Sequence, residues 1–351
     1  MHRFGWTATA LALVATAACA APPVDEATGE AQAEIKNGTP VSAASVYDET
    51  TVTFGYCTGT VIGPRHVLSA AHCAPRVGDP VMFYQGSLPY PGVTRTIARV
   101  YMPWGVDLSL QPPRDIFASG LANWDAGMFD SDGKYADIVV VELDSPISYP
   151  ARIALLPTTY LGNAPTGIMV GQGQHDGNAN PTNELRQTTS KVYSSDDADG
   201  HMLTDSADVN PGDSGGPFYT IRGSQAVVHG ALSGTRWEWA QRAKYTSVSF
   251  HIDRILRALG DVRIGAGLYY PSVTAYATQT KPSVRDCAAA CMQSTRCQTY
   301  EYTEATSVCA YKDSISGLWP SRTTGVRSGY KRSSGTGPCS ASTTVGGYCR
   351  F

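Results

Sequence analysis

Short apolar runs alternate with turn-forming residues from about residue 35 to residue 249. Closely spaced short strands that are divided by Gly and Pro are typical of an all-β sandwich or barrel. We therefore predict that the first domain is all-β, with strands at residues 45–54, 60–62, 66–68, 81–83, 96–102, 138–143, 167–170, 218–221, 227–232 and 245–250.

Helical periodicity is convincing at one place, residues 252–259, directly after this region. Ile252, Ile255 and Leu256 have the i, i+3, i+4 spacing that puts apolar side chains on one face of a helix, and Leu259 continues it at i+7. Gly260 can end the helix, because glycine readily adopts the left-handed conformation found after many helices. This helix is predicted to close the first domain.

The composition is that of a globular protein. With 351 residues, of which 16% are charged, the chain is long enough for two domains with buried cores and is unlike a disordered or coiled chain. The formal net charge is −3 and no run of Lys or Arg provides a basic surface. A nucleic-acid partner is therefore not expected.

The N-terminus has the features of an export signal, predicted over residues 1–20. Its apolar run is too short to span a bilayer, and it precedes the small-residue cleavage site Ala18-Cys19-Ala20. Cys19 has a second interpretation, as the lipid-bearing cysteine of a bacterial lipoprotein, which would anchor the chain to a membrane. Thr16 stands where such signals usually carry an aliphatic residue, so secretion is favoured. Residues 21–34, rich in Ala, Pro and Glu, are interpreted as a pro-segment.

Cysteine usage agrees with export. The chain has nine cysteines, and an even number remains once Cys19 is removed with the signal, which argues for disulfides in an exported protein. Their concentration after residue 286 marks a second domain. The remaining cysteines are Cys57, Cys73, Cys287, Cys291, Cys297, Cys309, Cys339 and Cys349.

The candidate chemistry begins at residues 212–217, Gly-Asp-Ser-Gly-Gly-Pro, where small residues suggest a turn that exposes the hydroxyl of Ser214. A serine is a poor nucleophile unless a neighbouring base removes its proton. His72 is the candidate base, because it lies beside Cys73, which can bridge back to Cys57 and fix the imidazole. We assign no chemistry to the other histidines, among them His66, His175 and His229.

The imidazole of such a base needs a carboxylate to orient it. Asp137 is the best candidate, because it directly precedes the apolar strand predicted at residues 138–143. Asp130 and Asp132 are interpreted as part of a turn. They resemble a fragment of a calcium loop whose remaining ligands are missing, so neither a metal nor a cofactor is predicted.

Three segments together resemble the signatures of trypsin-like (chymotrypsin-fold) serine proteases, in the family's order His, Asp, Ser. They are Ala70-Ala71-His72-Cys73, Asp137-Ile138-Val139-Val140-Val141 and the stretch 212–217. Gly171-Gln172-Gly173 is a weaker match to a Gly-Trp-Gly segment of the family. The resemblance covers residues 35–260 and implies two six-stranded antiparallel β-barrels, with the active site in the cleft between them and a helix at the end.

By this resemblance Ser214 attacks a peptide carbonyl, His72 takes and returns the proton, and Asp137 holds the imidazole. The backbone amides of Gly212 and Ser214 would form the oxyanion hole. Members of the family are synthesised as zymogens. The resemblance therefore also implies that cleavage after Glu34 frees the amine of Ile35 to pair with Asp213.

The same resemblance implies a substrate pocket. Asp208 stands six positions before the nucleophile, where trypsin-like enzymes carry the carboxylate that selects Arg or Lys. Ser233 and Thr235 fall on the predicted pocket wall, and Thr235 narrows its entrance. The alternative is that Asp208 is an ordinary loop acid, because Asn210 replaces the family's bracing cysteine.

Residues 263–331 are predicted to form a small α+β unit. Ser283 to Asp286 has the pattern of a capping box that opens a short helix, and residues 297–302 and 308–312 alternate like paired strands. The cysteine spacing resembles PAN/apple domains, which implies the disulfides Cys287–Cys309 and Cys291–Cys297. The unit is interpreted as a module that binds protein or glycan. One alternative is a disulfide-bonded extension that has no ligand, and another is a zinc site formed by the cysteines.

Residues 332–351 form a Gly/Ser-rich tail, in which Cys339 and Cys349 are predicted to close a small disulfide loop. Two functions remain open for the whole chain. The first is a secreted serine endopeptidase that acts on protein or peptide substrates. The second is a non-catalytic secreted binding or adhesion protein on the same scaffold. The intact trio His72, Asp137 and Ser214 favours the enzyme.

Overall fold

The computed structural model describes residue 35 and residues 38–110, 127–147, 151–173, 184–196, 199–206, 208–236, 242–264, 268–269, 274–314, 321–332, 344–345 and 348–350. The predicted signal peptide (residues 1–20), the pro-segment (21–34) and Cys339 lie outside these residues.

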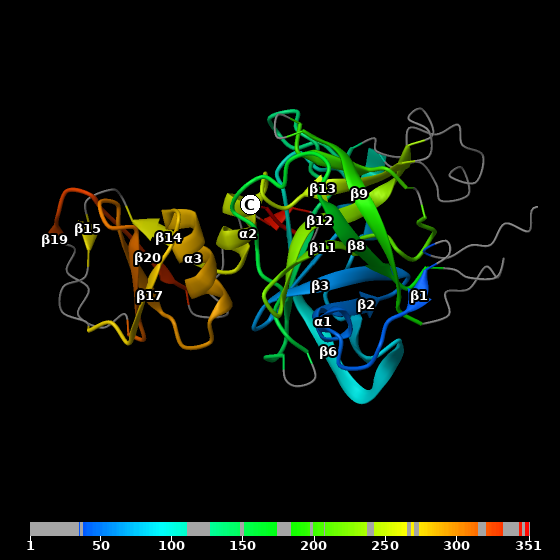
Figure 1. Cartoon of the computed structure of the whole chain (residues 1–351), viewed down its shortest axis with the longest axis horizontal. Coiled ribbons are helices and arrows are strands. Elements are labelled where there is room, and N and C mark those ends of the chain that lie inside the picture. The colour runs from blue at the N-terminus through cyan, green and yellow to red at the C-terminus, as the bar shows by residue number, and fades with distance from the viewer. Residues whose placement is uncertain are drawn as a thin grey trace, which may run out of the picture. The chain divides into compact units, whose positions relative to one another are not determined.

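The first barrel is a closed antiparallel ring of six strands. Figure 1 labels three of them, β2, β3 and β6. Its strand order is β6-β5-β2-β3-β4-β7, and β7 returns to pair with β6. The pairing encloses an apolar core of buried side chains such as Val52, Val61 and Val139. The strands are β2 (Thr51–Phe54), β3 (Cys57–Gly63), β4 (His66–Ser69), β5 (Pro80–Gln85), β6 (Leu88–Met102) and β7 (Val139–Leu143).

The second barrel has the same construction. Its order is β8-β9-β10-β13-β12-β11, and β11 closes the ring by pairing with β8. Strand β1 (Thr39–Pro40) adds to β9 at residues 186–187. The strands are β8 (Thr166–Gly171), β9 (Arg186–Asp196), β10 (His201–Thr204), β11 (Pro217–Arg222), β12 (Gln225–Arg236) and β13 (Arg242–Ser247). The two closed six-stranded barrels confirm the predicted architecture.

The helix predicted at residues 252–259 is confirmed as α2 (Ile252–Ala258), which follows the second barrel. The strand predicted at residues 45–54 is wrong in its first half, because α1 (Val46–Thr50) precedes β2. Ser45 causes the difference: its side chain accepts hydrogen bonds from the backbone amides of Tyr47 and Asp48, which begins a helix.

The C-terminal unit contains one helix against a five-stranded antiparallel sheet of order β14-β20-β17-β18-β16. The helix α3 (Val284–Gln293) begins at Ser283, whose side chain accepts from the amide of Asp286, as the capping pattern predicts. The strands are β14 (Asp261–Ile264), β16 (Ala277–Thr280), β17 (Thr299–Thr303), β18 (Val308–Lys312) and β20 (Val326–Lys331), with a separate pair β15 (Leu268–Tyr269) and β19 (Ser321–Arg322).

The predicted disulfides Cys287–Cys309 and Cys291–Cys297 are both present. The first joins α3 to β18, and the second joins the end of α3 to the segment before β17. The helix is therefore bonded covalently to one strand of the sheet and to the segment that leads into another, in addition to the contacts of the core.

The C-terminal tail returns to the first barrel. Strand β22 (Tyr348–Arg350) pairs with β21 (Thr344–Val345) and runs parallel to β6 at Tyr101 and Met102. Arg350 Nη1 donates to the carbonyl oxygens of Pro103 and Val106 at 3.1 and 2.9 Å. Cys349 is buried and disulfide-bonded; its predicted partner, Cys339, lies outside the described residues.

Candidate active site

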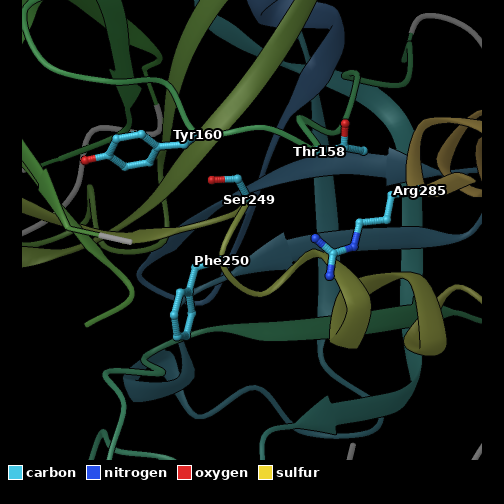
Figure 2. Close-up of a pocket in the computed structure, with 5 residues that line it drawn as sticks. All are labelled: Thr158, Tyr160, Ser249, Phe250 and Arg285. Carbon is cyan, nitrogen blue, oxygen red and sulfur yellow. The ribbon is translucent and has the colours of Figure 1, made fainter. Parts of the chain in front are cut away.

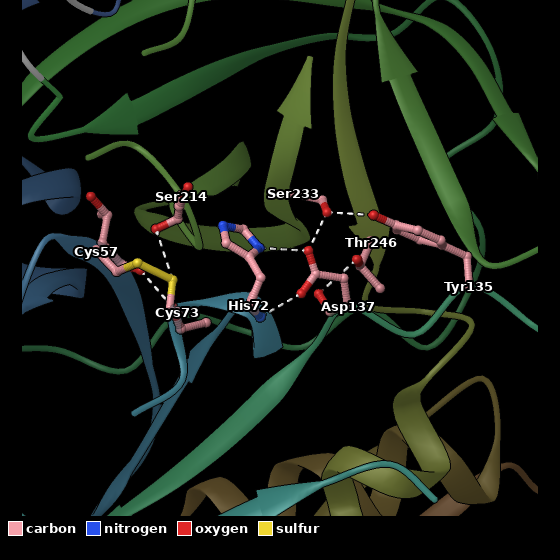
Figure 3. A network of polar contacts seen from close by, with 10 residues as sticks. Cys57, His72, Cys73, Tyr135, Asp137, Ser214, Ser233 and Thr246 are labelled. Atoms are coloured by element: carbon pink, nitrogen blue, oxygen red, sulfur yellow. Dashed lines mark hydrogen bonds and ion pairs between the residues drawn. A yellow bond between two sulfur atoms is a disulfide. The ribbon is translucent and has the colours of Figure 1, made fainter. Parts of the chain in front are cut away.

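His72 lies on a short 3-10 helix, η1 (Ala71–Cys73), that directly follows β4 (Figure 3). The predicted disulfide Cys57–Cys73 is present and joins this turn to the start of β3. Ser69 Oγ donates to the carbonyl of Thr58 at 2.7 Å, which adds a second link between the same two segments. The imidazole is therefore presented from a turn that is fixed on both sides.

Asp137 is fully buried and makes two hydrogen bonds with His72. Its Oδ2 lies 2.7 Å from His72 Nδ1, and its Oδ1 accepts from the backbone amide of His72 at 2.9 Å. Ser233 Oγ donates to the same Oδ2, and Thr246 Oγ1 donates to the carbonyl oxygen of Asp137 at 2.8 Å. Residues of both barrels therefore hold one carboxylate against one imidazole.

The environment keeps this carboxylate charged. Burial raises the pKa of Asp137, but the charge of His72 and the hydrogen bonds from His72 and Ser233 outweigh burial, so this pKa lies below its ordinary value. An ordinary imidazole titrates at about pH 6.5. Asp137 is thus an anion at any pH near that value and can stabilise an imidazolium.

Ser214 occupies the turn between β10 and β11 and is partly exposed. Its carbonyl oxygen accepts from the amide of Thr58 at 2.8 Å, and the next amide, that of Gly215, donates to Leu232 at 2.7 Å. The His72 ring lies between Ser214 and Asp137 (Figure 3). Gly212 has a φ of 109°, which an L-amino acid rarely adopts, so the turn requires glycine there.

Asp213 is buried beneath this turn. Its Oδ1 accepts from the amide of Gly173 at 2.7 Å and its Oδ2 accepts from the amide of Asn210 at 2.8 Å. The predicted activation residue Ile35 is also buried, in the apolar cluster of the second barrel that includes Met169. The Asp213 carboxylate thus joins the backbone at Gly173 to the backbone at Asn210, two residues before Gly212.

The three predicted pocket residues do not share one role. Asp208 Oδ2 accepts from Ser206 Oγ, and the carbonyl of Ser206 accepts from the amide of Ala243, which lies opposite Thr235 in the β12–β13 pair. Contacts through Ser206 and Ala243 of β13 therefore link Asp208 to the strand position of Thr235. Ser233 directs its hydroxyl to Asp137 instead, a contact that the sequence did not predict.

Sequence reasoning also missed the contributions of Thr58, Tyr135 and Thr246. Thr58 Oγ1 donates to the carbonyl of Gly212 at 2.9 Å, and the Tyr135 hydroxyl lies 2.5 Å from Ser233 Oγ. A Thr-Gly-Thr stretch and a tyrosine before an acid are too common to indicate such contacts.

Asp130 forms the predicted turn. Its Oδ1 accepts from the amides of Asp132 and Lys134 at 2.9 and 2.8 Å, and its Oδ2 pairs with Arg254. In the described part of the chain, no three His, Cys, Asp or Glu side chains form a group that could hold a metal ion.

A pocket of about 220 Å³ is formed by Thr158, Tyr160, Ser249, Phe250 and Arg285 (Figure 2). Three of its polar side chains make hydrogen bonds: Thr158 Oγ1 donates to Asp286 at 2.5 Å, Arg285 donates to Asp253 at 2.8 Å, and Ser249 Oγ lies 3.2 Å from Ser247 Oγ. None of the predicted site residues lines it, so it is separate from the candidate active site.

Comparison with known proteins identifies two domains. Residues 124–256 match the family model Trypsin, and residues 266–335 match the PAN domain. The first match includes Asp137 and Ser214, whereas His72 lies before it. No curated protein matches the chain. None of the helices among the described residues is long and apolar enough to cross a membrane.

Proposed function

We propose that this chain, with its trypsin-like domain followed by a PAN domain, is a secreted serine endopeptidase. The observation that supports this most directly is the 2.7 Å contact between His72 Nδ1 and the buried Asp137 Oδ2, with Ser214 on the other side of the ring. A carboxylate, an imidazole and a serine in this order can activate the hydroxyl for attack on a carbonyl carbon.

In the proposed reaction, Ser214 Oγ attacks the peptide carbonyl while His72 Nε2 takes the hydroxyl proton. The amides of Gly212 and Ser214 stabilise the oxyanion, and His72 then gives the proton to the leaving amine, which yields an acyl-enzyme. Water, activated by the same imidazole, releases the acid and restores Ser214. Asp137 remains ionised throughout and stabilises the imidazolium.

Labelling by a serine-directed fluorophosphonate distinguishes this enzyme from a non-catalytic binding protein. Because the reagent needs an activated serine, we expect stoichiometric labelling of the full chain and none of the Ser214→Ala variant. The Ser145→Ala variant is the matched control, since its hydroxyl donates to the neighbouring, exposed Asp144, and it should still be labelled. A wild-type protein that stays unlabelled after processing would favour the binding protein.

We further propose a preference for Arg or Lys before the scissile bond, with Asp208 as the selecting carboxylate. Asp208→Asn should lower kcat/KM for Arg and Lys peptides by roughly 10- to 100-fold, the worth of a charge-assisted hydrogen bond, and leave a Leu peptide nearly unchanged. The control is Asp205→Asn, because Asp205 instead holds Ser190 and the Lys191 amide. Equal rates on matched Arg and Leu peptides in the wild type would refute the preference.

The chain is also proposed to be an exported zymogen. Removal of residues 1–20 would leave the pro-segment 21–34, and a cut after Glu34 would free Ile35. An enzyme that prefers Arg or Lys does not cut after Glu, so a separate protease is required. N-terminal sequencing of the fluorophosphonate-labelled protein should begin at Ile35; labelled protein that begins at Ala21 would contradict this activation.

The PAN domain is proposed to bind a protein or a glycan and so to bring the catalytic domain to its substrate. Its two disulfides suit an extracellular setting. Attachment to a membrane through a lipid on Cys19 is the alternative to free secretion.

A further inference from the structure

A continuous line of hydroxyl contacts leads from the buried aromatic ring of Tyr135 to the carboxylate of Asp137 (Figure 3). The Tyr135 hydroxyl lies 2.5 Å from Ser233 Oγ, and Ser233 Oγ contacts Asp137 Oδ2, the atom that faces His72 Nδ1 at 2.7 Å. Tyr135, Ser233 and Asp137 are each at most 2% exposed. Water therefore does not compete for these contacts.

The direction of each hydrogen bond follows from the charge of Asp137. An ionised carboxylate can only accept, so Ser233 must donate its one proton to Asp137 Oδ2. The Tyr135 hydroxyl must then donate to Ser233 Oγ. Hydrogen bonds in such a series polarise one another, so the tyrosine makes the serine a stronger donor to the carboxylate.

Three neighbouring side chains contact Tyr135. Lys244 Nζ lies 3.2 Å from the centre of its ring, the imidazole of His201 meets the ring edge-on, and His251 Nε2 contacts its carbonyl oxygen at 2.9 Å. A cation over the ring draws electron density from the phenol and strengthens its hydroxyl as a donor. Lys244, His201 and His251 are thus three charged or titratable residues, all in the described part of the chain, that contact Tyr135.

We propose that Tyr135 is a positioning residue for the triad: through Ser233 it fixes the Asp137 carboxylate and sets the proton affinity of His72. The inference rests on the proposed protease function. It assigns a role to the residue two positions before the catalytic acid, with Lys244 polarising the phenol.

The test is the Tyr135→Phe variant of the full, processed chain, which keeps the ring and removes only the hydroxyl. With a weaker donor on Asp137, more negative charge faces the imidazole, which favours the protonated ring, and the carboxylate that orients the ring is held less firmly. We expect the acid limb of the kcat/KM profile to move up by about half a pH unit and kcat to fall roughly three- to tenfold, with KM unchanged.

Two further variants make the test specific. Tyr101→Phe is the control, because it removes another buried hydroxyl of the first barrel, one that donates to Glu142 at 2.6 Å, and it should leave the profile unchanged. In a Ser233→Ala background, Tyr135→Phe should have no further effect, since the relay runs through Ser233. A profile of Tyr135→Phe that matches the wild type, or a shift that persists without Ser233, would overturn the proposal.

Titration of His72 by NMR in histidine-labelled protein separates this inference from the proposed function. If the wild type neither hydrolyses peptides nor reacts with fluorophosphonate, the protease proposal fails. The same shift in His72 titration between wild type and Tyr135→Phe would still support the relay. An active wild type whose His72 titrates identically in the two proteins would reject the relay alone.

Discussion

Replacement of Asp137 by asparagine is expected to lower kcat by about 10⁴-fold while the fold persists. The asparagine amide has the shape of the carboxylate but carries no charge, so it cannot stabilise the imidazolium. It can also donate to His72 Nδ1, which leaves the proton on the nitrogen that faces Ser214 and removes the base. Steady-state hydrolysis of a peptide ester or amide, with the melting temperature of each variant, checks the prediction.

Asp130→Asn is the matched control for this experiment. Asp130 is a second buried acid nearby in the sequence, but it holds the turn at residues 130–134 and pairs with Arg254. Asp130→Asn should lower the melting temperature and leave kcat within a few-fold of the wild-type value. An Asp137→Asn protein that retains near wild-type kcat would show that the carboxylate at this position does not orient the base.

The proposed triad could be put forward from the sequence because each member lies in a short pattern that indicates its chemistry. Ser214 stands among glycines, His72 stands beside a cysteine with a bridging partner, and Asp137 starts an apolar strand. The hydroxyls around the acid carry no such local signal. Ser233 and Thr246 lie 96 and 109 residues from Asp137 along the chain and reach it only because the two barrels pack together.

The second barrel was the less predictable part of the fold. Strands β9 and β10 were not predicted, because β9 reads Arg-Gln-Thr-Thr-Ser-Lys-Val-Tyr-Ser-Ser-Asp, with few apolar residues. Pairing with β8 on one side and β10 on the other supplies its stability instead. The strand predicted for the first half of residues 45–54 was wrong because of a local signal. The helix cap at Ser45 outweighed the strand propensity of the residues after it.

Gly171→Ala should lower kcat by about 100-fold or more without altering any residue of the triad. A Cβ atom at Gly171, the last residue of β8, would overlap Asp213 Oδ1 and lie 2.7 Å from its Cγ. The carboxylate cannot simply turn away, because it is buried and accepts from the amides of Gly173 and Asn210. Displacing it moves the backbone that presents the amide of Gly212, a proposed oxyanion-hole donor, and losing one such donor lowers kcat about 100- to 1,000-fold.

Gly223→Ala is the control for the loss of a glycine, because nothing lies within 4 Å of a Cβ at that position. It tests the cost of a side chain at a positive φ, about 1 kcal/mol of folding stability, and should leave kcat intact. Gly171→Ala leaves the contacts of His72 with Asp137 untouched, so the loss of kcat would come from the turn around Ser214. A normal kcat in this variant would mean that the Asp213 carboxylate moves without disturbing Gly212, and that the turn around Ser214 does not depend on it.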